Sequence, residues 1–435
     1  MSDLRIPRGQ TVKLDKVDGD LRIGNNVTIQ ASDGKKVTVA KGVHLEGKAF
    51  VDCDLECDSL ESEVFVSTLK QANWGSNRAR LELTGRYSGK IEVNGNLTVH
   101  KKLNVSHSVK VTGAINAEDI DVGGKILAAA ITCSYMRVGG YAQIDGLFEA
   151  KTVEVGGKVY APNIVKLGDL RVGGEAQVGG GSITGIINVG GHFTAETTLE
   201  FGELQIYGRG HLPANCTGKK ISANGRLTVD GNIICNKLEI GGFVSVEGDC
   251  NAGKVEVGGK FQVSGSLTAT EGVEGYGHIE IAGNFESETL HIGGKFEANR
   301  ATTKEDAILS GKIVTKQGLK ANSIIVKSGT KCDGSLIAKQ IEVGKSQDMG
   351  YGTWGSMWQG KWAIGWGSAV TQDLYAHEVV IGPMSKVGRV FADIVKLEQG
   401  SAAQQVVYTS ELEADYTVGI CETPKKVTVL PAPPF

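Results

Sequence analysis

Two short acidic runs come closest to a spacing that could support acid–base chemistry. They are Asp52, Asp54, Glu56 and Asp58, which alternate with apolar residues, and the group Glu118, Asp119 and Asp121. Carboxylates held close together can act as general acid and base, but carbohydrate-cleaving sites on extended β proteins also need Lys and Arg in the same cluster. No Lys or Arg interleaves with either run. We therefore expect both runs to be solvated strand faces that keep the protein soluble.

The cysteines and histidines show no spacing typical of a metal site. Cys53 and Cys57 flank Leu55 on one face of an expected strand, where a thiol behaves as a small core hydrophobe. The alternative is that these two form a metal pair or a disulfide. The histidines, such as His192 and His278, recur at no common position, and we expect them to be exposed. Reduced core thiols agree with a cytoplasmic protein.

Five tryptophans lie in two glycine-bearing segments. Four of them are spaced four residues apart, and one lies far upstream: Trp354, Trp358, Trp362, Trp366 and Trp74. This spacing aligns side chains on one face of a helix or a strand, and the glycines between them disfavour a helix. The rings either pack on the flank of the fold or form a contact patch, because Trp anchors contacts between proteins well.

A repeat of about 17 residues must position all of these side chains. Gly-Gly pairs mark it at 123–124, 139–140, 156–157, 173–174, 190–191, 241–242, 258–259 and 293–294. Most pairs follow an alternating apolar run, which is strand periodicity. The period is too short for a helical hairpin, a propeller blade or a βαβ unit, and it fits one coil of a β-solenoid. Glycine would supply corners that need positive φ or close backbone packing. The pairs are not phosphate loops, because no helix follows them.

The composition suits a narrow stacked core. The chain has 435 residues, with 61 Gly, 8 Pro, 40% hydrophobic and 6% aromatic residues, which argues against disorder. A net charge of −3 predicts no polybasic surface for nucleic acid or anionic lipid. The N-terminus does not resemble a signal peptide, so we expect a cytoplasmic location and leave membrane association open.

The sequence predicts an all-β fold, a parallel β-helix of about 19 coils with strands stacked ~4.8 Å apart. The expected parts are a lead-in or cap (1–20), the solenoid (21–345) with an insertion near 59–89, a Trp/Gly-rich insertion (346–370), the final coils (371–400), and a C-terminal segment with a Pro-rich tail (401–435).

The stretch 307–344, AILSGKIVTKQGLKANSIIVKSGTKCDGSLIAKQIEVG, resembles the bactofilins, polymer-forming cytoskeletal proteins. Residues 120–343 repeat the same pattern of a strand, a glycine corner and G-x-[VIF]-x-[AV]. The resemblance implies a right-handed parallel β-helix that assembles end to end into filaments without nucleotide, as a scaffold that is often near membranes. This core would be longer than that of typical bactofilins.

From these patterns we expect a non-enzymatic scaffold with no cofactor, no metal and no nucleic-acid partner. Terminal coils of a solenoid expose unpaired backbone, which favours a homo-oligomer or filament. The Trp-rich insertion and the tail, with Leu430, Pro431 and Phe435, would bind other proteins. Two alternatives stay open. One is a non-polymerising binding module that presents the Trp-rich insertion, and the other is a β-helix carbohydrate-active enzyme.

Overall fold

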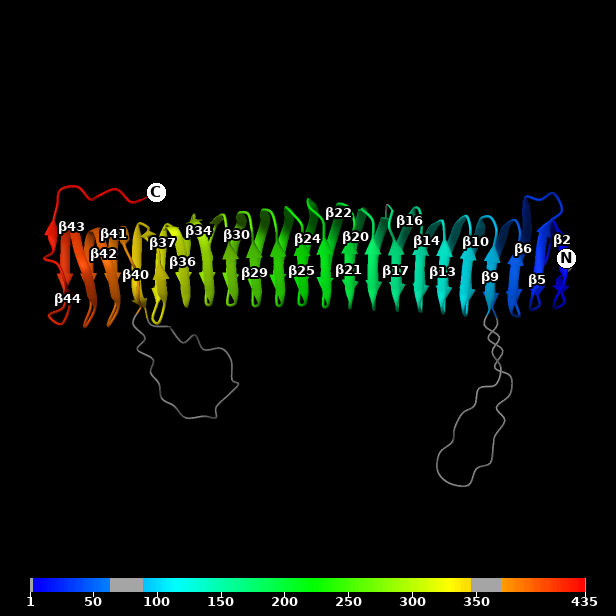
Figure 1. Ribbon diagram of the computed structural model, residues 1–435, viewed down its shortest axis with the longest axis horizontal. Helices are drawn as coiled ribbons and strands as arrows, with labels where there is room; N and C mark the ends of the chain where they lie inside the picture. The colour runs from blue at the N-terminus through cyan, green and yellow to red at the C-terminus, as the bar shows by residue number, and fades with distance from the viewer. Residues whose placement is uncertain (1–2, 63–88, 164, 346–368, 435) are drawn as a thin grey trace, which may run out of the picture. The chain divides into compact units, whose positions relative to one another are not determined.

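The computed structural model of the chain describes residues 3–62, 89–163, 165–345 and 369–434 (Figure 1). It is an all-β parallel solenoid of about 22 turns with about 17 residues per turn, which confirms the predicted fold class and is close to the expected 19 coils. No helix occurs in these ranges, and so none there could cross a membrane. The chain forms two compact units, residues 1–213 and 214–435.

Unit 1 is built from 23 strands. They are β1 (Leu4–Ile6), β2 (Thr11–Leu14), β3 (Lys16–Val17), β4 (Leu21–Ile23), β5 (Val27–Ala31), β6 (Lys36–Leu45), β7 (Lys48–Val51), β8 (Asp54–Ser62), β9 (Lys90–Val93), β10 (Leu97–Val105), β11 (Ser108–Val111), β12 (Ala114–Val122), β13 (Lys125–Ala128), β14 (Ala130–Val138), β15 (Tyr141–Ile144), β16 (Phe148–Val155), β17 (Lys158–Ala161), β18 (Val165–Val172), β19 (Glu175–Val178), β20 (Gly181–Val189), β21 (His192–Ala195), β22 (Leu199–Ile206) and β23 (Arg209–Leu212).

Unit 2 is built from 22 strands. They are β24 (Cys216–Ala223), β25 (Arg226–Val229), β26 (Ile233–Ile240), β27 (Phe243–Val246), β28 (Cys250–Val257), β29 (Lys260–Val263), β30 (Leu267–Gly275), β31 (His278–Ile281), β32 (Asn284–Ser287), β33 (Leu290–Ile292), β34 (Lys295–Thr303), β35 (Asp306–Leu309), β36 (Lys312–Lys320), β37 (Ser323–Lys327), β38 (Lys331–Asp333), β39 (Leu336–Ile337), β40 (Gln340–Lys345), β41 (Leu374–Ile381), β42 (Lys386–Leu397), β43 (Ala402–Ala414), β44 (Gly419–Ile420) and β45 (Lys425–Lys426).

A regular turn consists of one long strand and one short strand. In β16 the alternation of buried and exposed residues breaks once, at Lys151 and Thr152, so the long strand bends there and lies along two sides of the turn. The short strand β17 forms the third side, which we call the short-strand side. Each strand pairs in parallel register with the matching strand one turn away, as β16 does with β18.

The core is a set of inward columns of Val, Ile, Leu, Ala and Cys. Val155 and Val257, both at inward positions of the repeat, are only 3% and 2% exposed. In unit 2 the rings of Phe285 and Phe296 stack edge to face, with centroids 5.2 Å apart. Because each turn adds the same columns, burial depends on the turns on either side rather than on one central nucleus.

Most of the paired glycines are required by close backbone approach, and none of them by positive φ. None of the eight predicted pairs adopts a left-handed conformation. Instead, a Cβ on Gly157 would lie 2.2 Å from the carbonyl oxygen of Gly140, and a Cβ on Gly174 would lie 2.5 Å from that of Gly157. The sequence suggested two roles for these glycines, positive φ and close backbone packing, and the structure shows the packing role.

The solenoid register extends past both ends of the range 21–400. Strands β1 and β2 pair in parallel with β4 and β5, so residues 4–17 form a turn where the sequence suggested a lead-in or cap. At the other end β43, β44 and β45 continue the stack as far as Lys426. Most of the predicted insertions, residues 63–88 and 346–368, lies outside the described residues.

Candidate functional site

The first turn of unit 1 presents an open strand edge. β1 pairs only with β4, β2 only with β5, and β3 only with β6 among the described residues. The opposite edge of these three strands therefore carries unpaired backbone N–H and C=O groups. Such an edge is a template for pairing with another chain.

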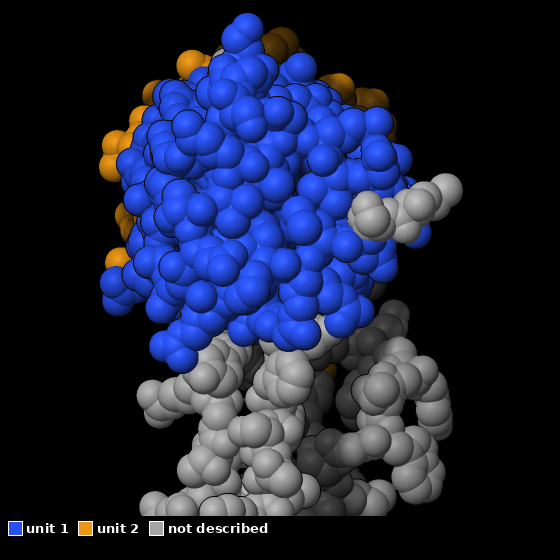
Figure 2. All heavy atoms as spheres, turned by 90° about the vertical axis from the view of Figure 1, so that its right-hand side faces the viewer, with its two compact units in different colours: residues 1–213 blue, residues 214–435 orange. Residues whose placement is uncertain are grey.

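Apolar side chains accompany this edge. Leu4 lies in register with Leu21, and Val12 lies in register with Ile29. Leu21 and Ile29 are fully buried, whereas Leu4 and Val12 are half-buried because no turn covers them. Figure 2 shows this end of unit 1 (in blue) facing the viewer. The end combines unpaired backbone with partly exposed core residues.

The last turn of unit 2 is incomplete. β44 and β45 pair with only two residues each of β43, and no strand pairs with the outer edge of 409–414 in the described chain. After β45 the tail turns back along unit 2, and the Val427 amide donates to the Tyr408 carbonyl at 2.8 Å (Figure 1). Leu430, a predicted contact residue, is half-buried in this tail, and Pro431 is exposed.

The acidic run in β8 has basic neighbours that the linear sequence hides. Lys36 on the preceding turn forms an ion pair with Glu56, and His100 Nε2 on the following turn lies 2.9 Å from a Glu56 oxygen. Lys101 Nζ lies 2.7 Å from Asp58. The Lys36 contact, followed by that of His100, lowers the pKa of Glu56. No Lys or Arg interleaves with this run in the sequence, but stacking brings basic residues beside it from the turns on either side.

The second acidic group, on β12, is arranged in the same way. Asp119 lies in register with Lys102 on one neighbouring turn, and Asp121 lies in register with Arg137 on the other. Glu118 is exposed at the bend. Apart from Asp52, which lies in the bend before β8, both runs lie on outward strand faces as expected, and cations lie beside them.

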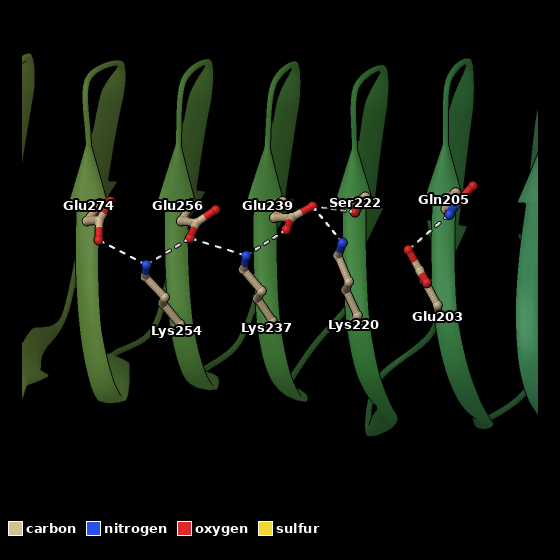
Figure 3. Close-up of polar contacts among 9 residues, drawn as sticks. All are labelled: Glu203, Gln205, Lys220, Ser222, Lys237, Glu239, Lys254, Glu256 and Glu274. Carbon is tan, nitrogen blue, oxygen red and sulfur yellow. Dashed lines mark hydrogen bonds and ion pairs between the residues drawn. The ribbon is translucent and has the colours of Figure 1, made fainter. Parts of the chain in front are cut away.

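A ladder of lysines and glutamates crosses four turns of unit 2 (Figure 3). Lys237 Nζ lies 2.8 Å from Glu239 and 3.2 Å from Glu256, so it joins two turns. Lys254 repeats this geometry at 2.9 Å from both Glu256 and Glu274. Glu239 also forms an ion pair with Lys220 at 3.0 Å and accepts a hydrogen bond from the Ser222 hydroxyl at 2.8 Å. In unit 1, shown in the same figure, Gln205 donates to Glu203 at 2.9 Å.

The pKa values in the ladder favour the charged forms. Burial raises the pKa of Glu239, but hydrogen bonds from Lys237, Lys220 and Ser222 outweigh it and lower the pKa to about 2. Hydrogen bonds to Glu256 and Glu274 raise the pKa of Lys254. A carboxylate with so low a pKa is a poor proton donor at neutral pH. The arrangement suits cohesion between turns rather than acid–base chemistry.

The sequence carries a signal for this ladder that local motifs do not contain. Lys220, Lys237 and Lys254 are each 17 residues apart, as are Glu239 and Glu256, so they occupy equivalent positions of successive turns. A search for charge at the period of the repeat would have found them.

The predicted inward cysteines are confirmed. Cys53 and Cys57 are 4% and 0% exposed, and they flank the buried Leu55. All eight cysteines are free thiols, and only Cys421 is exposed. Within the described residues no group of three or more His, Cys, Asp or Glu could hold a metal ion. The predicted contact residues Trp74, Trp354, Trp358, Trp362, Trp366 and Phe435 lie outside the described residues.

Comparisons of this chain with protein-family models, with curated proteins and with solved structures find no match.

Proposed function

We propose that this protein is a structural scaffold, bactofilin-like and cytoplasmic, that self-assembles without nucleotide through the ends of its solenoid. The observation that carries this proposal is the open edge of the first turn, formed by β1, β2 and β3. Unpaired backbone groups at a strand edge are satisfied either by water or by another strand, and a second copy offers strands of the same register and spacing.

The apolar part of the first turn adds a driving force. Leu4, Val12 and Leu14 are half-buried, and a covering turn would remove their remaining apolar surface from water. Burial of apolar surface stabilises association by about 25 cal/mol per Å² before the entropic cost of docking is subtracted. Backbone pairing would supply direction, and apolar contact would supply affinity.

The two end turns differ, so the kind of assembly depends on which of them meet. The first turn offers three short strands, whereas the last turn offers the free part of β43, residues 409–414, beside β44 and β45. A contact between two different surfaces is heterologous, and it generates an open filament unless the rotation closes a ring. Contact between two first turns would instead give a closed dimer.

Negative-stain electron microscopy of the purified full chain, without nucleotide, tests the proposal. We expect filaments for the native protein and single particles for Val12→Glu, because a carboxylate placed at the half-buried position opposes covering by another turn. Thr11→Glu is the matched control, since Thr11 is exposed on the same strand and should still allow assembly.

Thermal melting checks that both variants are folded. Single particles for the native protein over a range of concentration and salt would contradict the proposal. They would favour the alternative of a binding module that does not polymerise. Equal loss of filaments in Val12→Glu and Thr11→Glu would show that the inward side of the first turn is not the contact surface.

A further inference from the structure

A file of cations runs along the short-strand side of unit 2. Seven residues on successive turns lie in register on strands β25, β27, β29, β31, β34, β36 and β38, and we call them the cation file: Arg226, Phe243, Lys260, His278, Lys295, Lys312 and Lys331. Five of the seven are Lys or Arg. The net charge of −3 for the whole chain conceals this local excess.

Much of this charge is not neutralised. Lys295 Nζ lies 2.6 Å from Glu297, but the Lys260 ammonium is 3.9 Å from Glu280. Lys312 is exposed and forms no ion pair within the described residues, although its charge contributes to the lowered pKa of Glu297. Lys331 is likewise exposed, and nothing in the described chain forms an ion pair with it. A row of partly unpaired cations attracts a linear anion more strongly than isolated pairs would.

The Phe243 ring and the His278 imidazole fill the two positions of the file that carry neither Lys nor Arg. Arg226 Cζ lies 4.9 Å and Lys260 Nζ 5.9 Å from the Phe243 ring centroid, so the ring is already engaged by cations. His278 Nε2 is buried without a hydrogen-bond partner and lies 4.0 Å from Glu280. Burial, followed by Lys295 and Lys260, lowers the pKa of His278.

A hollow of about 340 Å³ is lined by residues that lie two positions further along the strands of the cation file. Its lining includes a second outward row, again in register from turn to turn: Ser245, Gln262, Glu280, Glu297 and Val314. Gln262 donates to Glu280 at 2.8 Å, and Lys316 also lines the hollow. Hydroxyl, amide and carboxylate groups in a row are suited to the hydroxyls of sugars.

We propose that the short-strand side of unit 2 binds a linear acidic polysaccharide, with the sugar acids on the cation file and the hydroxyls in the hollow. Turns repeat every ~4.8 Å, a step close to the length of one pyranose residue, so both rows can follow one extended chain. The two glutamates of the hollow can accept hydrogen bonds from sugar hydroxyls, which a polyphosphate does not offer. Single-stranded nucleic acid also needs free aromatic faces for its bases, and the Phe243 ring is engaged by Arg226 and Lys260.

Binding of polygalacturonate to the full chain tests this proposal, with neutral pullulan and inorganic polyphosphate as the comparison polymers. In about 50 mM NaCl we expect polygalacturonate to bind and pullulan not to bind. The triple variant Lys260→Gln/Lys295→Gln/Lys312→Gln should weaken binding about tenfold or more, since it removes three charges from the file. The charge-matched control Lys320→Gln/Lys327→Gln/Lys339→Gln, with lysines that lie outside the file, should change binding less than about twofold.

A second variant separates sugar recognition from charge alone. Ser245→Val/Gln262→Leu removes neutral hydrogen-bonding groups from the hollow and leaves the cation file intact. It should therefore weaken the binding of polygalacturonate about fivefold and leave any binding of polyphosphate unchanged. No binding of polygalacturonate, or equal losses in the two triple variants, would overturn the proposal. The proposal would also be overturned if polyphosphate bound as tightly as polygalacturonate and if Ser245→Val/Gln262→Leu changed the affinity for the two polymers equally. That result would indicate general attraction to anions.

Discussion

Burial controls the chemistry of single residues in this protein, and the cysteines show it most clearly. Burial raises the pKa of Cys57, Cys133, Cys235 and Cys332 to about 12, and it also raises the pKa of Cys250. The thiolate is the reactive form, so these thiols are protonated at neutral pH as well as inaccessible.

We therefore expect a thiol reagent at about pH 8 to modify one cysteine per folded chain, the exposed Cys421. The other seven should react only after denaturation, because their modification requires the turns to open. Counting thiols with a chromogenic disulfide, with and without denaturant, gives the measurement, and Cys421→Ser is the control that should abolish the fast reaction. Rapid reaction of two or more thiols in the folded chain would contradict the inward placement.

At the scale of the turn, the two glycines of one pair should differ in how well they tolerate substitution by alanine. A Cβ on Gly259 would lie 2.0 Å from the Gly242 carbonyl oxygen, whereas one on Gly258 would meet only the Ile240 carbonyl oxygen at 3.7 Å. Gly259→Ala must push two turns apart, and we expect it to lower the free energy of unfolding by about 2 kcal/mol or more. Gly258→Ala should change the free energy of unfolding by less than about 0.5 kcal/mol. Denaturant unfolding of both variants measures the difference, and equal effects would show that the corner can relax.

The lysine–glutamate ladder predicts a dependence of stability on pH. Since the pKa of Glu239 is lowered to about 2 in the folded protein, its contribution is present above the unfolded value of about 4.3 and is lost as the pH falls toward 2. Glu239→Gln should therefore lower the free energy of unfolding at pH 7, by about 1 kcal/mol because the pair is partly solvated.

Near pH 2 the same variant should unfold like the native protein, since the protonated carboxyl resembles an amide. Glu247→Gln is the control: Glu247 is exposed, and its side chain has no partner among the described residues. Urea unfolding at both pH values measures the effect. A cost for Glu239→Gln that is the same at pH 2 and pH 7 would mean that packing, not charge, makes its contribution.

Local sequence patterns predicted the strands, corners and inward residues of a turn. They did not predict the side-chain contacts between turns. Alternation was enough to place Cys53 and Cys57 inward, because this signal lies within one stretch of chain. The partners of Glu56 were missed because Lys36 and His100 are 20 and 44 residues away in sequence and become neighbours only when turns stack. The cation file was hidden for the same reason.

At the scale of the whole molecule, the two proposals depend on different forces. Assembly through the first turn rests on backbone pairing and apolar burial, and salt does not weaken apolar burial. Polysaccharide binding rests on the cation file, and charges at an exposed surface are screened as the Debye length falls from about 10 Å at 0.1 M salt to about 3 Å at 1 M.

Raising NaCl from about 50 mM to about 1 M should thus release polygalacturonate while filaments persist, as measured by sedimentation and electron microscopy on one sample. Val12→Glu should lose filaments at every salt concentration and keep polysaccharide binding, because Val12 belongs to unit 1 and the file to unit 2. The triple variant of the file should show the reverse. If filaments of the native protein dissolve as salt rises, ionic contacts between copies hold them together, and the first turn is not the principal joint.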